Sequence, residues 1–264
     1  TELGYASHNS TAFGKDNQRV TAYRGAELSS NVYNIYLRVA TTSTADLKTI
    51  TWSGVSTLTP SSAGNMRSLG IVYDTVADKY VLVWKGASDY IHGCTLTVSG
   101  TGATATVSAG TNIVINSDGM TGYLNDNSLC YDTANSFSIA SWSYSTPKTC
   151  SLSISGTNLT AGTTYTLSNN TKGQGGSTVW GASGTLSGTT ITFGALTQIS
   201  NIVGMANTFN GRVLKPIEDN KFIYATSTQT TSPTLPYRGV YSIITVSGTS
   251  TSYGTITAYS PQYT

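Results

Sequence analysis

Charged residues are scarce in this sequence. Its 264 residues include 14 Lys or Arg and 12 Asp or Glu, so that 10% are charged, against roughly 25% in an ordinary soluble domain. The basic residues form no run and the net charge is only +2, so we expect neither nucleic acid nor an anionic membrane as a partner. The longest apolar runs, such as "YVLVW" at 80–84, have the length of a strand and fall far short of a membrane span, so no membrane insertion is expected.

Cysteine and histidine are also rare. The three cysteines, Cys94, Cys130 and Cys150, are odd in number and lack metal-like spacing. Because Cys94 and Cys150 occupy matching places in two repeats, they are expected to lie too far apart for a disulfide, and we predict that all three are buried small hydrophobic residues. The two histidines, His8 and His92, form no HExxH or other metal pair. The sequence therefore predicts no metal site and no cofactor.

The polar surface must come instead from Ser, Thr, Asn and Gly, and Thr alone occurs 45 times. Thr and Val suit the pleated surface of a sheet and disfavour a helix. These preferences predict an almost entirely β protein. Abundant Ser and Thr without a disulfide framework resemble a secreted or virion surface more than a cytosolic enzyme.

A strand–turn–strand signature recurs along the chain. It reads "VSGT" at 98–101, "ISGT" at 154–157, "LSGT" at 186–189 and "VSGT" at 246–249. Upstream, "GIVYDTVADKYVLVWKG" at 70–86 aligns with "SLCYDTANSFSIASWSY" at 128–144, which places Trp84 and Trp142 58 residues apart as expected core residues. Asp at the start of each upstream turn accepts backbone hydrogen bonds, and Gly in each SGT turn supplies the backbone freedom that a tight reversal needs.

The repeat predicts a module of four short antiparallel strands, at 70–74, 79–86, 94–100 and 104–110 in the clearest copy. Modules of this kind are expected at approximately 6–60, 66–115, 123–170 and 208–262, with a partial copy of only the last two strands at 177–200. A unit of this size and strand order matches a propeller blade, whereas immunoglobulin-like tandem domains need about 100 residues each. We therefore predict a single all-β domain over 1–264, β-propeller-like, with four to five blades of four-stranded antiparallel sheets.

The segments "YDTVADKYVLVW" at 73–84 and "TVWGASGTLSGTTITFGALTQI" at 178–199 resemble repeats of the tail-fibre and spike proteins of bacterial viruses. The similarity lies in the Tyr-Asp turn, the alternating strand that ends in Ser-Gly-Thr, and the following "ITFG" strand, and it covers roughly residues 65–260. The partial module departs from the pattern because it lacks the first two strands. The resemblance implies a location on a virion surface or outside the cell. Its motifs describe a fold unit and not a reaction.

The sequence contains no recognisable catalytic constellation. There is no GxSxG elbow, and no acidic residue lies between Thr133 and Ile217, whereas a glycosidase usually places two carboxylates across the scissile bond. Asp74 and Asp132 recur with the module and are interpreted as turn residues. We predict that the protein is not an enzyme and has no catalytic residues.

The loops of the module suggest where a ligand would bind. In a propeller, the turns after the first and third strands lie at one end of the blade, which we call the turn end, and the remaining loops lie at the other, the loop end. Here the turns are short and uniform, whereas the loops, such as 24–31 and 85–93, are longer and irregular, and varied loops on a rigid scaffold carry recognition. The predicted ligand-binding residues at the loop end are Asp89, Tyr90, His92, Tyr123, Asn125, Asp126, Tyr144, Tyr237 and Arg238.

Three functions stay open on the sequence. The first is the receptor-binding part of a viral fibre or spike that recognises a host cell-surface glycan or receptor protein and contacts other virion proteins. The second is a structural capsid or filament component that self-associates as a homo-oligomer, because low charge permits close packing of identical subunits. The third is a secreted carbohydrate-binding lectin or glycosidase. The start at Thr1 rather than Met fits a processed, trimmed or partial product.

Overall fold

The computed structural model describes residues 9–29, 32–46, 48–59, 69–86, 89–118, 129–143, 147–166, 179–195, 197–200, 213–228, 238–255 and 257–258. Their regular elements are β-strands, together with a short 3-10 turn, η2 (Gly102–Thr104). The prediction of an all-β fold is confirmed.

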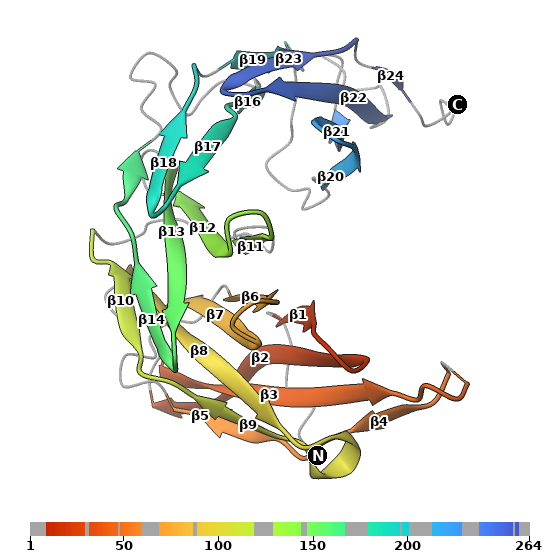
Figure 1. Cartoon of the computed structure of the whole chain (residues 1–264), viewed down its shortest axis with the longest axis vertical. Helices are drawn as coiled ribbons and strands as arrows, with labels where there is room; N and C mark the ends of the chain where they lie inside the picture. Colours follow the sequence, from red (N-terminus) through yellow and green to blue (C-terminus); the bar gives the residue numbers. More distant parts are fainter. Residues whose placement is uncertain are drawn as a thin grey trace. The chain divides into compact units, whose positions relative to one another are not determined.

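Four antiparallel sheets share one plan, a meander of four strands in which the fourth strand is split into two pieces that both pair with the third (Figure 1). We call them modules 1, 2, 3 and 5. Module 1 comprises β1 (Asn9–Phe13), β2 (Gln18–Ser29), β3 (Val32–Thr42), β4 (Ile50–Trp52) and β5 (Ser56–Leu58). Module 2 comprises β6 (Leu69–Asp74), β7 (Lys79–Lys85), β8 (Ile91–Ser99), β9 (Thr106–Ala109) and β10 (Ile113–Asn116). Module 3 comprises β11 (Leu129–Asp132), β12 (Phe137–Ser143), β13 (Pro147–Ser155), β14 (Asn158–Ala161) and β15 (Tyr165–Thr166). Module 5 comprises β20 (Val213–Glu218), β21 (Lys221–Thr228), β22 (Arg238–Ser247), β23 (Ser250–Tyr253) and β24 (Thr257–Ala258).

Module 4 is a hairpin, as the sequence predicts for 177–200. Both of its strands are split, so that β16 (Val179–Gly181) pairs with β19 (Thr197–Ser200), and β17 (Gly184–Ser187) pairs with β18 (Thr190–Phe193). These pieces correspond to the third and fourth strands of the other modules. No closed propeller is identified among the described sheets, so the confirmed architecture is an all-β fold of repeated antiparallel sheets.

The chain divides into two compact units. The first is Thr1–Ser168 with Ser187–Thr190, and the second is Asn169–Leu186 with Ile191–Thr264. Modules 1 to 3 belong to the first unit, and module 5 with most of module 4 belongs to the second. The expectation of one domain over 1–264 stays a prediction.

The SGT turns have the backbone geometry that their glycines predict. Gly156, Gly188 and Gly248 have φ angles of +60°, +55° and +56°, and each opens a two-residue loop, such as the one closed by the pair Ser155 and Asn158. A Gly with positive φ at the first loop position is the type II′ arrangement, whose twist matches that of the flanking strands. Module 2 differs, because its chain passes through η2 before the strands pair again.

The turns after the first strands are held by aspartate, as predicted. The Asp74 carboxylate accepts hydrogen bonds from the backbone N–H groups of Val76 and Ala77 at 2.9 and 2.8 Å. Asp132 accepts the same two bonds in module 3, at 2.9 and 3.3 Å. A side-chain oxygen that satisfies two backbone donors fixes a tight turn without a longer loop.

Each split in the fourth strand of modules 2 to 5 falls at a glycine. The backbone N–H groups of these glycines donate to the third strand at 2.8 to 2.9 Å; the residues are Gly110, Gly162, Gly194 and Gly254. In three of them the glycine also lies against the SGT turn of the following module, so that an added Cβ would lie well inside van der Waals contact with the Thr157, Thr189 or Thr249 carbonyl oxygen. Only a residue without a side chain permits this approach.

A hydroxyl group completes the contact in modules 2 and 3. Thr95 Oγ1 donates to the Thr157 carbonyl oxygen at 2.6 Å, and Ser151 Oγ donates to the Thr189 carbonyl oxygen at 2.9 Å. We call the split-strand glycine with its third-strand hydroxyl the turn notch. In each turn notch, the hydroxyl donates one hydrogen bond to a carbonyl oxygen of the next module's SGT turn, and the glycine packs closely against the backbone of that turn.

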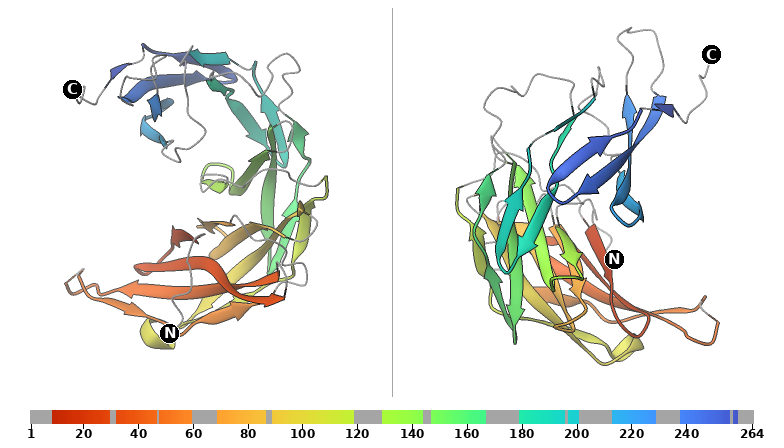
Figure 2. Two further views of the ribbon diagram at one scale, coloured as in Figure 1. Left: turned by 180° about the vertical axis from the view of Figure 1, so that it is seen from behind. Right: turned by 45° about the horizontal axis from the view of Figure 1, so that its top comes forward.

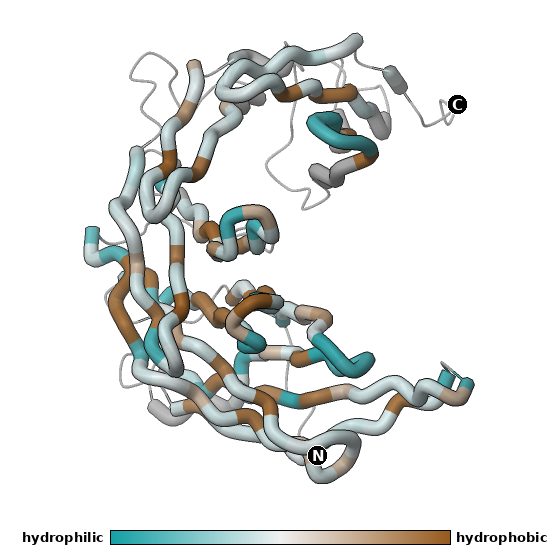
Figure 3. The backbone as a smooth tube through the Cα atoms, in the orientation of Figure 1, coloured by the Kyte–Doolittle hydropathy of each residue, from teal (hydrophilic) through white to brown (hydrophobic). Residues whose placement is uncertain are grey.

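Modules 1 to 3 pack face to face within the first unit, and Figure 2 shows them following one another from red to green. Alternate side chains of β7 enter two apolar cores, with Tyr80, Leu82 and Trp84 toward module 1 and Val81 and Val83 toward module 3. Because module 2 is covered on both faces, its second strand is a continuous apolar run rather than an alternating one. Trp84 and Trp142 are both buried in these cores, which confirms the prediction for them. Along the chain, hydrophobic positions are interspersed among weakly polar ones (Figure 3).

The second unit has a smaller apolar core and a hydroxyl contact between its modules. Ile244 packs with Phe222, Val246 and Tyr253 in a small core of module 5. Thr251 Oγ1 donates to Ser183 Oγ at 2.9 Å, which joins module 5 to module 4. This pairing of hydroxyl groups adds to the close approach of Gly194 and Thr249 in linking the two modules.

The cysteine prediction holds for two of the three residues. Cys94 and Cys150 are buried in the two cores of the first unit, and burial raises the pKa of each thiol to about 12. Cys130 is exposed, so the prediction is wrong for it. Leu129 enters the core shared with module 2, and because side chains alternate along a strand, the next residue of β11 points to the opposite face.

Candidate functional site

Four of the nine predicted ligand-binding residues fall within the described residues, namely Asp89, Tyr90, His92 and the backbone of Arg238. Arg238 was expected in a loop but is the first residue of β22, where it pairs with Thr228. The expected loop at 24–31 is also largely strand, because β2 continues past two register shifts to Ser29. The remaining five lie outside the described residues: Tyr123, Asn125, Asp126, Tyr144 and Tyr237.

The prediction of His92 as a loop residue is wrong. It is the second residue of β8, pairs across the sheet with Trp84, and is only 3% exposed. The two rings are stacked, with centroids 5.9 Å apart and planes 17° apart. Burial lowers the pKa of His92, and a hydrogen bond with Asn112 opposes that change. His92 is thus a packed, neutral side chain beneath the loop end.

The short loop between β7 and β8 is fixed by an ion pair. The Lys85 ammonium lies 2.7 Å from the Asp89 carboxylate, and the side chains are 9% and 53% exposed. Asp89 has a φ of +62°, a left-handed conformation that Asp tolerates better than most residues. The Gly86 N–H donates to the Tyr90 carbonyl oxygen at 2.9 Å and closes the loop. The loop therefore presents the outer side of a carboxylate next to a half-buried tyrosine.

A second ion pair at the loop end joins modules 2 and 3. Asp118, just after β10, contacts the ammonium of Lys148 on β13. Asn116 supports it, since its side chain donates to Asp118 at 3.3 Å and accepts the Asp118 N–H at 3.1 Å. The hydrogen bond from Lys148, followed by that from Asn116, lowers the pKa of Asp118. The carboxylate is held ionised at neutral pH.

Most acidic side chains in the described part of the chain are occupied by turn hydrogen bonds or ion pairs. The occupied carboxylates are those of Asp46, Asp74, Asp78, Asp89, Asp118, Asp132 and Glu218. Among the described residues there is no group of three or more His, Cys, Asp or Glu that could hold a metal ion. The arrangement can offer hydrogen bonds to a ligand, whereas general acid–base chemistry needs a carboxyl group poised to exchange a proton.

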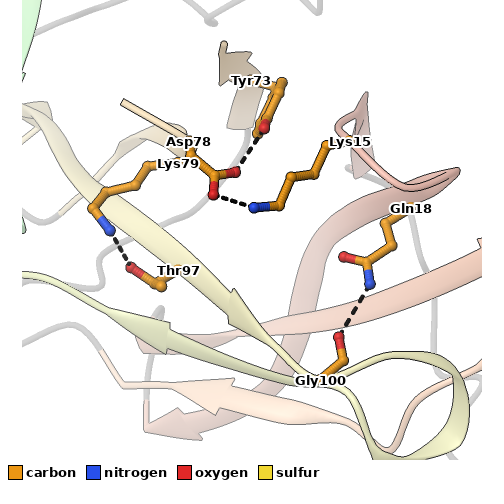
Figure 4. Close-up of polar contacts among 7 residues, drawn as sticks. All are labelled: Lys15, Gln18, Tyr73, Asp78, Lys79, Thr97 and Gly100. Atoms are coloured by element: carbon orange, nitrogen blue, oxygen red, sulfur yellow. Dashed lines mark hydrogen bonds and ion pairs between the residues drawn. The ribbon is translucent and has the colours of Figure 1, made fainter. Parts of the chain in front are cut away.

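The turn end, by contrast, ties successive modules together. Lys15 in the β1–β2 turn contacts Asp78 in the β6–β7 turn, and the Tyr73 hydroxyl donates to the same carboxylate at 2.7 Å. The Tyr131 hydroxyl donates to Asp74 at 2.9 Å and joins module 3 to module 2. Figure 4 shows the first contact together with the hydrogen bonds from Lys79 to Thr97 and from Gln18 to Gly100.

Sequence reasoning missed a cluster of aromatic and arginine side chains on module 1. Phe13 and Trp52 are 73% and 43% exposed, and the guanidinium of Arg19 lies within 6 Å of both ring centroids. The available signal was that module 1 carries Arg19 and Arg38 at positions where module 2 carries the core residues Tyr80 and Cys94. The register that brings these residues together is not readable from the sequence.

No protein-family model matches the chain, and no curated protein matches it. No helix in the described residues is long and apolar enough to span a membrane.

Proposed function

We propose that this chain is a non-catalytic surface protein of a virion, the receptor-recognition part of a fibre or spike, and that its loop end binds a host-surface glycan or protein. The observation that carries the proposal is the contrast between the two ends of the modules. At the turn end the same aspartate turns and SGT turns recur. At the loop end the sequences differ from one module to the next. A fixed framework with varied loops is the usual organisation of a binding protein.

We propose further that the modules are blades of a β-propeller-like fold. Two observations support this finer assignment. Modules 1 to 3 pack face to face through two apolar cores, and the close approach of an SGT turn to a split-strand glycine recurs in modules 2, 3 and 4. Repeated antiparallel sheets of four strands are the unit from which propellers are built.

Binding to host cells tests the proposal. The fluorescently labelled protein is expected to label its host cells, and Tyr90→Ala is expected to reduce the labelling severalfold. Val76→Ala is the matched control, because Val76 is 70% exposed in a turn at the opposite end of the same module. The control should label cells as the unchanged protein does.

Two outcomes would contradict the proposal. Labelling that survives Tyr90→Ala and removal of the 116–127 and 227–239 loops would refute the assignment of the binding surface. Failure to label any candidate host, combined with light scattering that rises with concentration beyond that of a monomer, would replace receptor recognition with self-association.

A further inference from the structure

The face of module 1 that points away from module 2 has an unusual composition. In the first unit, the side chains of Ala12, Val20, Ile35, Leu37 and Val39 enter the core with module 2. Because side chains alternate along each strand, their neighbours point to the outer face. We call this outer surface the arginine–aromatic face; it comprises Phe13, Arg19, Tyr23, Tyr36, Arg38 and Trp52.

Strand register assembles the face from four strands. Phe13 pairs with Arg19, Arg19 with Ala40, and Ala40 with Trp52, which makes one row from β1 to β4. Three strand spacings of about 4.8 Å give this row a length of roughly 14 Å. In a parallel row Tyr23 pairs with Tyr36, and their rings meet edge to face with centroids 5.7 Å apart.

The two guanidinium groups are held by aromatic rings. Arg19 lies 5.8 Å from the Phe13 centroid and 5.9 Å from the Trp52 centroid, and Arg38 lies 5.4 Å from the Trp52 centroid. Arg38 also donates two N–H groups to the Ser53 carbonyl oxygen at 3.2 and 3.0 Å. Within the described part of the chain, the Arg19 guanidinium has no hydrogen-bond or ion-pair partner. Its planar set of donors is positioned for an anion.

Comparison with module 2 shows that this face is not built for apolar packing. Arg19 lies opposite Ala40 as Tyr80 lies opposite Leu96, so that Arg19 occupies the place of a core tyrosine. By the same register, Arg38 occupies the place of the buried Cys94. A partner with an apolar surface would strip water from both guanidinium groups and return no acceptor, which is costly.

The local charge favours an anionic ligand. Among the described side chains of module 1 the acids are Asp16 and Asp46, which lie in turns and not on the strands of the face. Asp46 is occupied by hydrogen bonds from Lys48 and Thr49. A guanidinium binds a carboxylate through two parallel hydrogen bonds, and an exposed aromatic ring offers a flat surface to the C–H face of a sugar ring. Carboxylate and sugar ring occur together in uronic acids.

We propose that the arginine–aromatic face binds an acidic polysaccharide, with Arg19 pairing a uronic acid carboxylate while Phe13 and Trp52 pack against the adjoining sugar rings. The length of the row corresponds to a short oligosaccharide segment rather than to one sugar. This site lies on a sheet face and not at the loop end, so it does not depend on the receptor-recognition proposal.

Calorimetric titration with hexagalacturonate tests the site, with neutral maltohexaose and hexaglutamate as comparison ligands. Hexagalacturonate should bind and should weaken as salt is added. Arg19→Ala should lower the affinity at least tenfold, and Arg19→Lys, which keeps the charge without the planar donors, should recover part of it. Arg24→Ala is the matched control, because it removes the same charge from the same strand while Arg24 stacks on Tyr33 at 4.6 Å, outside the face.

Trp52 fluorescence gives a second measurement on the unsubstituted protein, which protects the test against a variant that fails to fold. Hexagalacturonate should shield Trp52 from acrylamide quenching. Of the four tryptophans, Trp84 and Trp142 are buried, and a Trp180→Phe background removes the fourth, so that adding Trp52→Phe should abolish the shielded component. No binding of hexagalacturonate, or equal binding by Arg19→Ala, would overturn the site. Equal affinity for hexaglutamate would overturn the carbohydrate assignment, and equal affinity for maltohexaose would overturn the role of the carboxylate. Tyr90→Ala should leave this binding unchanged, which separates it from the loop-end proposal.

Discussion

A single glycine sets how closely module 3 approaches module 2. An added Cβ at Gly110 would collide with the Thr157 carbonyl oxygen and the Thr95 hydroxyl, so Gly110→Ala forces the turn notch apart. Overpacking of this kind costs about 1–3 kcal/mol, and we expect the melting temperature to fall by several degrees. Gly54→Ala is the control, because Gly54 lies in the split of the fourth strand of module 1 with nothing within 4 Å of an added Cβ. The melting temperatures are measured by circular dichroism. If both variants lost the same amount, the close packing of Gly110 against Thr157 would not be what destabilises Gly110→Ala.

The exposed Cys130 should react faster with a thiol reagent than the buried Cys94 and Cys150. At pH 8, one equivalent of thiol is expected to react with Ellman's reagent in the folded protein, and all three after denaturation. The fast thiol is Cys130, the one cysteine that is exposed. Partial loss of solvent around its sulfur, and then the nearby Asp132, raise the pKa of this thiol and slow the reaction. Cys94 and Cys150, with pKa values of about 12, stay protonated and covered. Cys130→Ser should abolish the fast phase, and a second fast equivalent would show that a core opens.

At the scale of elements, acid should loosen the contact between the β1–β2 and β6–β7 turns. The hydrogen bond from Lys15, and then that from Tyr73, lower the pKa of Asp78. Because the pKa is lower in the folded state, the stabilisation is present above about pH 4, the ordinary value, and is lost as the pH falls through the folded value. Lys15 and Asp78 are 57% and 49% exposed, so the contribution of this contact to the free energy of unfolding is expected to be small and screened by salt.

The variant Asp78→Asn isolates this contribution. Asp78 has a φ of +53°, and Asn tolerates that conformation at least as well. The melting temperature of the variant should lie below that of the unchanged protein at pH 7, and the difference should shrink progressively as the pH falls below about 4. A difference that stays constant in acid would indicate that the amide disturbs the turn itself.

The elements that could be predicted from the sequence are those fixed by neighbours along the chain. The aspartate turns and the SGT turns depend on two to four residues each, and both were predicted. The split after Ala109 was not, because it is fixed where Gly110 meets a carbonyl group of module 3, far along the sequence. His92 was placed in a loop because its strand begins earlier than the repeat suggests, through pairing with Trp84. Phe13, Arg19, Arg38 and Trp52 share a face only through strand register, so the arginine–aromatic face required the fold.

At the scale of the whole molecule, the division into two units predicts that residues 1–168 fold alone. Both apolar cores of modules 1 to 3 lie inside this fragment. It loses the hydrogen bond from Ser151 to the Thr189 carbonyl oxygen and the packing of that turn against Gly162. We expect a β-type circular dichroism spectrum and dispersed amide resonances, with a modestly lower melting temperature than the full chain. Loss of resonance dispersion would mean that the second unit is required for folding.

The full chain is expected to hydrolyse no glycan. Glycosidases place two carboxyl groups about 5–10 Å apart across the scissile bond, one of them able to donate a proton. The acids described at the loop end are already paired, Asp89 with Lys85 and Asp118 with Lys148, and the pKa of Asp118 is lowered, which is the wrong direction for a general acid at neutral pH. A broad panel of labelled glycans should therefore show no turnover above that of a heat-denatured control. Turnover that is lost in Asp89→Asn or Asp126→Asn but kept in the control Val76→Ala would contradict this prediction. The protein would then be a glycosidase, with its second carboxylate in the loops.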